Sequence, residues 1–388
     1  MVRNIISERG SELPVSTMGK LISIAAEDKS VISLGPGEPD FDSPKNVIRA
    51  AKRSLDRGYT HYSPPAGRLK LREAIAKKLS KENGVKATPN NVIVTSGSTE
   101  GILLALMNTI DPGEGVIITD PGFLAYKPAI ELLNGVPISI PLKEEEGFQL
   151  SVDRMQDMVI PEKTNAMILN TPMNPTGTVL SKKTLEEVAD FAVENEILVI
   201  SDEAYEKLVY SDAKHISIGS LNGMEDHVIT LQTFSKTYAM PGFRVGYACG
   251  PDNIIKSMSK LHIFSSISAP TVSQMAALEA LKGPQGAVGR MVKEYDRRRK
   301  MVIRRLKSIP NFFCMEPKGA FYAFPNISEF GMSSLDFAKF LLEKAKVATV
   351  PGTEFGSHGE GYIRISYATE YGKIEEALDR IDRVVSKI

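Results

Sequence analysis

Short apolar runs recur along the first three quarters of the chain. They are rich in valine and isoleucine and do not alternate with polar residues, which is typical of strands buried on both faces of a largely parallel sheet. Apolar residues at helical spacing occur between such runs, as in residues 181–194, where Ser181 is a candidate N-cap. This alternation predicts an α/β fold. Strands are expected at residues 92–95, 116–119, 166–169, 197–200, 228–231 and 245–248.

The pattern also predicts how the chain divides into domains. Residues 47–285 are expected to form a large α/β domain, whose mostly parallel, mixed central sheet is flanked by helices. From about residue 286 a long charged helix is expected, followed by helices, such as 371–387, and separate strands. This predicts a smaller α+β domain over residues 286–388. Residues 1–46 are too few for a core of their own, so we expect them to join the smaller domain or to cover the site. The separate strands are expected near residues 319–324, 347–350 and 362–367.

Composition narrows the class of protein. The 388 residues carry 47 basic and 47 acidic side chains, and a net charge of zero argues against a nucleic-acid or membrane-surface partner. The two cysteines, Cys249 and Cys314, cannot build a disulfide framework or a four-ligand zinc site. No apolar run approaches the roughly 20 residues that span a bilayer, and the N-terminus lacks the apolar core of a signal peptide. A cytoplasmic protein is therefore expected.

Polar or Gly/Pro-rich clusters come directly after five of the predicted strands. In open α/β sheets, ligands bind outside the carboxyl ends of the strands. Five clusters at five such ends therefore predict one shared site. The clusters are SGST, DPGF, NTPMNPTG, SDEAY and QTFSK.

The cluster at residues 96–100 (SGSTE) lies between a predicted strand and an apolar helix. A glycine-containing turn before a helix offers free N–H groups and a positive dipole end, which suit a phosphate. An ordinary capped turn is the alternative. The sequence lacks the Gly-Lys-Ser/Thr ending of a Walker A loop. Residues 35–40 (GPGEPD) lack the third glycine of a dinucleotide-binding motif and are interpreted as a turn.

Four other side chains are candidates for chemistry. Asp202, at a strand end, is a possible metal ligand, helix cap or carboxylate that charges a ring nitrogen, and the local sequence does not choose among them. Lys236 comes after a buried strand, where desolvation would make it a nucleophile, although most lysines are solvated. Arg244 suits a phosphate and Arg364 a carboxylate, unless the latter is a surface residue of an edge strand. Together with the phosphate turn, this set matches the needs of a pyridoxal phosphate enzyme.

Seven motifs, in order along the chain, carry a resemblance to a known family. They are GEPDFDSP, HYSPPAG at residues 61–67, SGSTEG, NPTG, SDEAY, SKT with MPGFRVGY, and RISYA. In these motifs the sequence resembles the aspartate aminotransferase family, the class I/II branch of the fold-type-I pyridoxal phosphate enzymes. The resemblance implies that fold, aminotransferase activity, and a homodimer with active sites shared across the interface.

The resemblance also implies a role for each matching residue. Lys236 would hold the cofactor as an internal aldimine and later move the proton, and Asp202 would pair with the pyridine nitrogen. The phenolic oxygen of the cofactor would be bound by Tyr205 and Asn174, and Phe123 would stack on its ring. The substrate α-carboxylate would be bound by Arg364, Asn174 and the backbone at Gly37. The phosphate would be held by Gly97, Ser98, Thr99, Ser235 and Arg244, with Tyr62 reaching it from the partner subunit.

The expected reaction moves an amino group between an L-amino acid and a 2-oxo acid by a ping-pong mechanism. Glutamate and 2-oxoglutarate are expected as one pair, with aspartate, an aromatic amino acid or alanine as the partner substrate. Family members that bind a distal carboxylate use a lysine in the phosphate turn or an arginine of the partner chain. Here the turn position holds Thr99, and residues 261–268 offer only His262, so the preferred donor stays open.

Two other functions are compatible with parts of the pattern. A C–S β-lyase would share the cofactor residues but would release pyruvate and ammonia. A non-enzymatic, cofactor-sensing regulator would need a DNA-binding domain, whereas the aminotransferase-like pattern fills this chain and its charge is neutral. A different cofactor would leave Lys236, Asp202, Asn174 and Arg244 unexplained.

Overall fold

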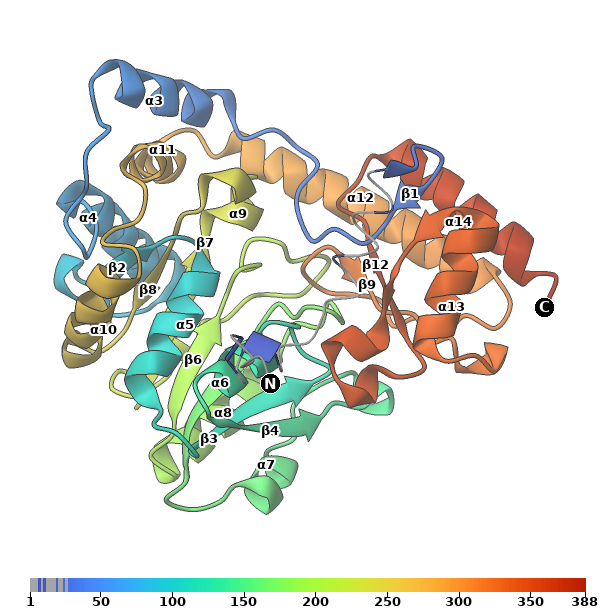
Figure 1. Cartoon of the computed structure of the whole chain (residues 1–388), viewed down its shortest axis with the longest axis horizontal. Coiled ribbons are helices and arrows are strands. Elements are labelled where there is room, and N and C mark those ends of the chain that lie inside the picture. The colour runs from blue at the N-terminus through green and yellow to red at the C-terminus, as the bar shows by residue number, and fades with distance from the viewer. Residues whose placement is uncertain (1–5, 8–9, 12–18, 20–23, 25–26) are drawn as a thin grey trace, which may run out of the picture.

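A computed structural model describes residues 6–7, 10–11, 19, 24 and 27–388 (Figure 1). Its centre is a seven-stranded sheet in the order β2-β8-β7-β6-β5-β3-β4. All strands run parallel except β8, which is antiparallel to β2 and β7. The sheet consists of β2 (Val92–Thr95), β3 (Gly115–Asp120), β4 (Val136–Pro141), β5 (Thr164–Asn170), β6 (Leu198–Asp202), β7 (Val228–Thr233) and β8 (Gly246–Cys249).

Successive strand residues pack on opposite faces of the sheet. Met167 belongs to one buried cluster and Ile168 to another, and Val199 and Ile200 divide in the same way. Neither face of the sheet is exposed to solvent, so the residues that point to either face are apolar. This explains why apolar and polar residues do not alternate along the strands. The six predicted strands are confirmed within one or two residues at their ends.

The sequence pattern missed β4. This strand contains Pro137 and Pro141, which cannot donate to a ladder and are tolerated only at a sheet edge or a strand end. β4 lies at the edge and pairs only with β3, so the prolines cost no hydrogen bond to a second neighbour.

Helices cover both faces and one end of the sheet. The N-terminus of α8 is capped as predicted, because the Ser181 side chain accepts a hydrogen bond from the Thr184 N–H. The helices packed on or around the sheet are α3 (Lys45–Asp56), α4 (Leu69–Lys78), α5 (Ser98–Thr109), α6 (Tyr126–Leu132), α7 (Val152–Met158), α8 (Lys182–Glu194), α10 (Asp252–Ser265) and α11 (Thr271–Lys282), while α9 (Phe234–Thr237) is a single turn after β7.

The C-terminal part forms a second unit around a buried cluster that also includes Leu208 and Tyr210, which follow β6. The long charged helix is confirmed as α12 (Gly286–Ser308), which leads away from the helices beside the central sheet (Figure 1). It packs with α14 (Tyr371–Val385), and Val302, Leu306 and Leu378 share one buried cluster. The remaining elements are α13 (Ser334–Phe340), the antiparallel strands β11 (Val350–Pro351), β12 (Ile363–Ser366) and β9 (Tyr322–Ala323), and a separate pair of β1 (Ile32–Ser33) with β10 (Val347–Ala348).

The N-terminal segment meets this C-terminal unit. β1 runs parallel to β10, and Leu34 belongs to the core of the unit. The division of the chain at residues 47 and 286 stays a prediction, and much of the segment 1–46 lies outside the described residues. Within the described part of the chain, no helix has both the length and the apolar character needed to span a membrane.

Candidate active site

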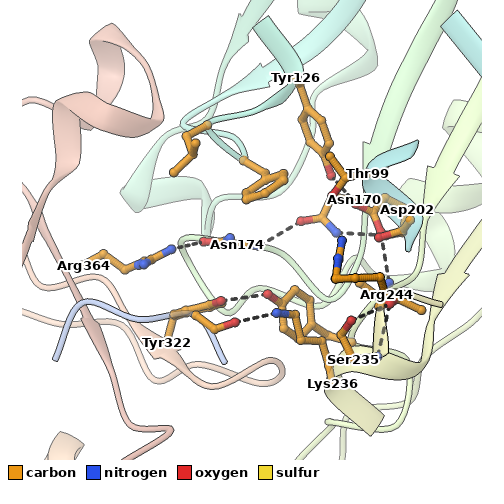
Figure 2. Close-up of a pocket in the computed structure, with 17 residues that line it drawn as sticks. Thr99, Tyr126, Asn170, Asn174, Asp202, Ser235, Lys236, Arg244, Tyr322 and Arg364 are labelled. Atoms are coloured by element: carbon orange, nitrogen blue, oxygen red, sulfur yellow. Dashed lines mark hydrogen bonds between the residues drawn. The ribbon is translucent and has the colours of Figure 1, made fainter. Parts of the chain in front are cut away.

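A pocket opens at the sheet edge where β5, β6 and β7 end. Tyr322 of β9 and Arg364 of β12 close it from the C-terminal unit (Figure 2). Arg244, just before β8, reaches the same edge because β8 runs in the opposite direction to its neighbours. The lining residues are Gly37, Ser98, Thr99, Phe123, Leu124, Tyr126, Asn170, Asn174, Asp202, Ala204, Tyr205, Thr233, Ser235, Lys236, Arg244, Tyr322 and Arg364.

One wall of the pocket is the turn between β2 and α5. Gly97 precedes the helix with a φ of +87°, a conformation that favours glycine. A Cβ on Gly97 would lie 2.7 Å from Nη2 of Arg244, so the missing side chain also lets the guanidinium approach the turn. Ser98 and Thr99 begin α5, whose positive dipole end faces the pocket. The turn and Arg244 together form a site suited to an anion.

Asp202 ends β6 with its carboxylate in the pocket. Its Oδ2 accepts a hydrogen bond from the Tyr126 hydroxyl over 2.8 Å, and its Oδ1 accepts one from the Ala204 N–H over 3.1 Å (Figure 2). Burial raises the pKa of Asp202, whereas the hydrogen bond from Tyr126 acts in the opposite direction. The carboxylate is therefore held in one orientation, in a setting of low polarity where a cationic partner would be bound strongly.

Lys236 lies in the single helical turn after β7. Its Nζ donates a hydrogen bond to the Gly37 carbonyl over 2.5 Å. Burial lowers the pKa of Lys236 to about 8, far below the usual value for lysine. About a tenth of this amine is therefore neutral at pH 7, far more than for a solvated lysine, and the neutral form is what a nucleophile or base requires.

Arg364 and two tyrosines form the opposite wall. Nη1 of Arg364 donates to Oδ1 of Asn174 over 2.9 Å. Its guanidinium carbon lies 4.4 Å from the ring centre of Tyr322 and 4.7 Å from that of Phe355. The hydroxyls of Tyr322 and Tyr205 lie 2.7 Å apart. The buried guanidinium is thus held between two aromatic rings, an arrangement that suits bidentate binding of a carboxylate.

A loop of the C-terminal unit, residues 352–359, brings Phe355 to Arg364. Asp120, at the end of β3, fastens this loop. Its Oδ2 accepts from the N–H and hydroxyl of Ser357 over 3.0 and 2.9 Å, and its Oδ1 accepts from the His358 N–H over 3.0 Å. A Cβ on Gly356 would lie 2.0 Å from Oδ1 of Asp120. Asp120 therefore connects the seven-stranded sheet to the loop that supports Arg364.

A second buried polar network lies next to Asp202 in sequence but does not line the pocket. Glu206 pairs with the Lys78 ammonium, and its Oε2 accepts from Asn83 and Gln232 over 2.7 and 2.9 Å. Glu203 contacts His215 over 3.1 Å. Among the described residues, Glu203, Glu206 and His215 are the only group with ligand atoms close enough for a metal, and the ammonium of Lys78 already neutralises Glu206. That group does not include Asp202, so Asp202 belongs to no cluster of three or more such residues in the described part of the chain.

The structure brings most of the predicted site residues together. Gly97 lies beside the pocket, in contact range of Arg244. Tyr62 does not line the pocket of its own chain, and it is 78% exposed. His262 is fully buried and lines no part of the pocket. The predicted residues that line it are Gly37, Ser98, Thr99, Phe123, Asn174, Asp202, Tyr205, Ser235, Lys236, Arg244 and Arg364.

Sequence reasoning missed several lining residues. Asn170 is the last residue of β5 and Tyr126 comes shortly after the DPGF cluster, so strand-end position could have identified both. Tyr322 comes from a separate unit with no local signal. The others that were missed are Leu124, Ala204 and Thr233.

A family model for class I and II aminotransferases matches residues 29–381. The chain belongs to this family. The aminotransferase is 48% identical over 383 residues to an aspartate aminotransferase of Pyrococcus abyssi, with 98% of each chain covered. It is 45% identical over 385 residues to aromatic-amino-acid aminotransferase 2 of Thermococcus litoralis, again with 98% of each chain covered.

Solved structures show the same fold. The aminotransferase superimposes on an aromatic aminotransferase of Pyrococcus horikoshii with a TM-score of 0.90 and 47% identity, covering 96% of this chain and 99% of the other. With an aspartate aminotransferase of Thermus thermophilus in complex with maleate, the TM-score is 0.94 and the identity 36%, covering 98% and 100%. The expected fold type I is thereby confirmed, and the predicted roles of individual residues stay predictions.

Proposed function

We propose that this aminotransferase uses pyridoxal phosphate, bound at Lys236, to move amino groups between L-amino acids and 2-oxo acids by a ping-pong mechanism. The observation that carries the proposal is the placement of a buried lysine amine and a buried carboxylate in one pocket, next to an anion-binding turn (Figure 2).

The residues present fit this cofactor. A phosphate would be bound by the N–H groups at the start of α5 and by Arg244, whose guanidinium can approach the turn because position 97 has no side chain. Asp202 would face the ring nitrogen, and Tyr205 and Asn174 the phenolic oxygen, with Phe123 against the ring. When bound, pyridoxal phosphate supplies an electron-accepting ring that makes the α-proton of an attached amino acid acidic.

The chain's own groups would carry out the proton transfers. Lys236, with a pKa lowered to about 8 by burial, takes the α-proton as a base and returns it as an acid. Asp202 would keep the ring nitrogen protonated by pairing with it, while the hydroxyl of Tyr126 keeps the carboxylate aligned.

Arg364 would bind the substrate α-carboxylate. Asn174 orients the guanidinium through its side-chain oxygen, and the rings of Tyr322 and Phe355 exclude water from its faces. Such an arginine would hold the α-carboxylate of every amino acid substrate in the same position, so that the α-carbon of each faces Lys236 in the same way.

The side-chain preference is left open by the lining residues. Among the described lining residues the cations are Lys236, Arg244 and Arg364, and each has a role already. A distal carboxylate would therefore need a group outside this set. We propose glutamate and 2-oxoglutarate as one pair because of the family resemblance, with aspartate, an aromatic amino acid or alanine as the second.

We propose a homodimer in which Tyr62 reaches the partner's phosphate. Supporting this, Tyr62 is exposed on a segment whose Ser63 is hydrogen-bonded to Thr271 over 2.8 Å. Phe264, at the end of α10, is 89% exposed, and its neighbours Ile263 and Ile267 are exposed as well. A group of exposed apolar side chains is typical of a surface that another protein covers. A cytoplasmic location stays a prediction.

Visible absorption of the purified enzyme with pyridoxal phosphate tests the proposal, recorded before and after single amino acids are added without an oxo acid. The expected result is loss of the band of the lysine-bound cofactor with stoichiometric release of the matching 2-oxo acid. Lys236→Ala should retain the fold but should show neither the band of the lysine-bound cofactor nor release of the 2-oxo acid. Catalytic release of ammonia and pyruvate would instead indicate a β-lyase, and a band that no amino acid alters would reject the proposal.

A further inference from the structure

A buried ion pair lies directly behind the phosphate turn. Glu100, the residue after Thr99, has its Oε2 3.2 Å from Nε2 of His262 on α10. The histidine side chain is fully buried and that of Glu100 is 15% exposed. No part of the predicted catalytic machinery uses either residue.

The contacts of His262 fix its protonation. Nε2 faces the Glu100 carboxylate, and Nδ1 lies 2.8 Å from the carbonyl oxygen of Pro65. Both partners can only accept hydrogen bonds, so these two contacts favour a ring that carries hydrogen on both nitrogens, the imidazolium. Burial opposes the charge, but Glu100 outweighs it and raises the pKa of His262.

Glu100 also ties the turn together. It accepts hydrogen bonds from the Ser96 N–H over 2.6 Å and from the Ser266 hydroxyl over 2.6 Å. Burial opposes its ionisation, yet the hydrogen bonds from His262, Ser266 and Ser96 lower its pKa to about 2. The carboxylate is therefore ionised, and it stands in the first turn of the helix that receives the phosphate.

An ionised carboxylate so close to a phosphate would repel it. In a buried setting this repulsion is poorly screened, because the effective dielectric constant is low. The imidazolium of His262 cancels the charge, so that Glu100 can brace Ser96 without lowering the anion affinity of the turn. Through Pro65 the same ring holds the segment that carries Tyr62.

We infer that His262 is a positioning residue for the cofactor phosphate, which compensates the charge of Glu100 behind the phosphate turn. The inference rests on the proposed function, since it concerns the phosphate of the same cofactor.

The test measures the Kd of pyridoxal phosphate for the cofactor-free enzyme, from the visible absorption band, and the competition by inorganic phosphate. His262→Asn leaves the Glu100 charge uncompensated, and the Kd is expected to rise about tenfold or more. Glu100→Gln should stay within about threefold of the unaltered enzyme. The double variant E100Q/H262N should recover most of the loss, because no charge then needs compensation.

If charge compensation is the role of His262, the double variant binds pyridoxal phosphate more tightly than His262→Asn. If its role is only structural, the double variant binds no better than His262→Asn. His215→Asn is the matched control, since it alters another buried histidine–glutamate pair that does not line the pocket, and it should leave the Kd unchanged. An unchanged Kd in His262→Asn, or absence of rescue, would overturn the inference.

Should His262→Asn fail to fold, the comparison of Glu100→Gln with E100Q/H262N still decides. Equal Kd values are expected, and weaker binding by the double variant would contradict charge compensation. If the unaltered enzyme itself gives no visible band with pyridoxal phosphate, the proposed function fails. If it gives the band but His262→Asn binds the cofactor as tightly as the unaltered enzyme, only this inference fails.

Discussion

The hydroxyl of Tyr126 and Oδ2 of Asp202 lie 2.8 Å apart, and the tyrosine is the donor. Tyr126 begins α6 and Asp202 ends β6, so this bond joins two parts of the sheet edge. Because the Ala204 N–H holds the other carboxylate oxygen over 3.1 Å, the carboxylate cannot rotate without breaking a hydrogen bond.

Tyr126→Phe should therefore weaken the pairing of Asp202 with the cofactor ring. A hydrogen bond to a charged group contributes about 1.5–3 kcal/mol, so kcat is expected to fall at least about tenfold. Loss of the donor raises the pKa of Asp202 further, and the acid limb of the kcat–pH profile should move to higher pH. Steady-state kinetics from pH 4 to 8 checks this, and an unmoved acid limb would argue against the role of Tyr126.

Lys236 predicts how cofactor capture depends on pH. Only the neutral amine attacks an aldehyde, and burial lowers its pKa to about 8. The rate of capture of pyridoxal phosphate by the cofactor-free enzyme should rise about tenfold per pH unit below pH 8 and level off above it. Stopped-flow absorption between pH 6 and 10 measures the rate. A rise that continues to pH 10 would show an ordinary, solvated lysine.

Glu206 predicts loss of stability in acid. Burial opposes its ionisation, but Lys78 outweighs burial and lowers the pKa of Glu206 to about 2, against 4.5 for the ordinary side chain. Between these pH values the unfolded chain binds more protons, so the free energy of unfolding falls as the pH falls from about 4.5 towards 2.

Glu206→Gln removes this titration and leaves the Lys78 charge buried without its partner. The free energy of unfolding at pH 7 should drop by about 3–5 kcal/mol and depend less on pH below 4.5. Denaturant titrations at several pH values measure both effects. Glu225→Gln is the control, because its pair with Lys86 is exposed and should contribute at most about 1 kcal/mol.

Asp120→Ala should loosen the 352–359 loop, since it removes the acceptor for the N–H groups of Ser357 and His358. Phe355 would then support Arg364 less well, and the KM for the amino acid is expected to rise about fivefold or more. The Kd of pyridoxal phosphate should change less than the KM, because the hydrogen bonds that are lost join Asp120 to Ser357 and His358 and involve none of the predicted phosphate-binding residues. Unchanged KM values across a panel of amino acids would contradict this account.

The sequence predicted those site residues that lie at the ends of strands. Asp202 and Lys236 lie at or just after the ends of buried strands. Because the carboxyl ends of parallel strands meet at one edge of the sheet, the proximity of these two residues was foreseeable from the pattern. Their roles came from the family resemblance, because a strand-end aspartate alone suits a cap or a metal equally well.

Features that depend on contacts between distant segments could not be predicted. Tyr322 reaches Tyr205 from the two-residue strand β9 of the C-terminal unit. The residues next to it in the sequence give no sign that it lines the pocket. The Asp120 anchor depends on a loop more than two hundred positions away along the chain. Strand β4 was missed for a local reason, since its prolines are acceptable only at an edge and the sequence does not show which strand is at the edge.

The pairing of β1 with β10 has a consequence for synthesis on the ribosome. Ile32 lies beside Val347, and Ser33 beside Ala348, so this ladder joins two segments that are more than three hundred residues apart in the chain. Closing so long a loop is entropically unfavourable and slow, whereas the strands of the central sheet lie close together in the chain. The nascent polypeptide can therefore assemble the sheet before β1 has its partner strand, and the wall with Arg364 is completed only once residues 347–366 have been synthesised.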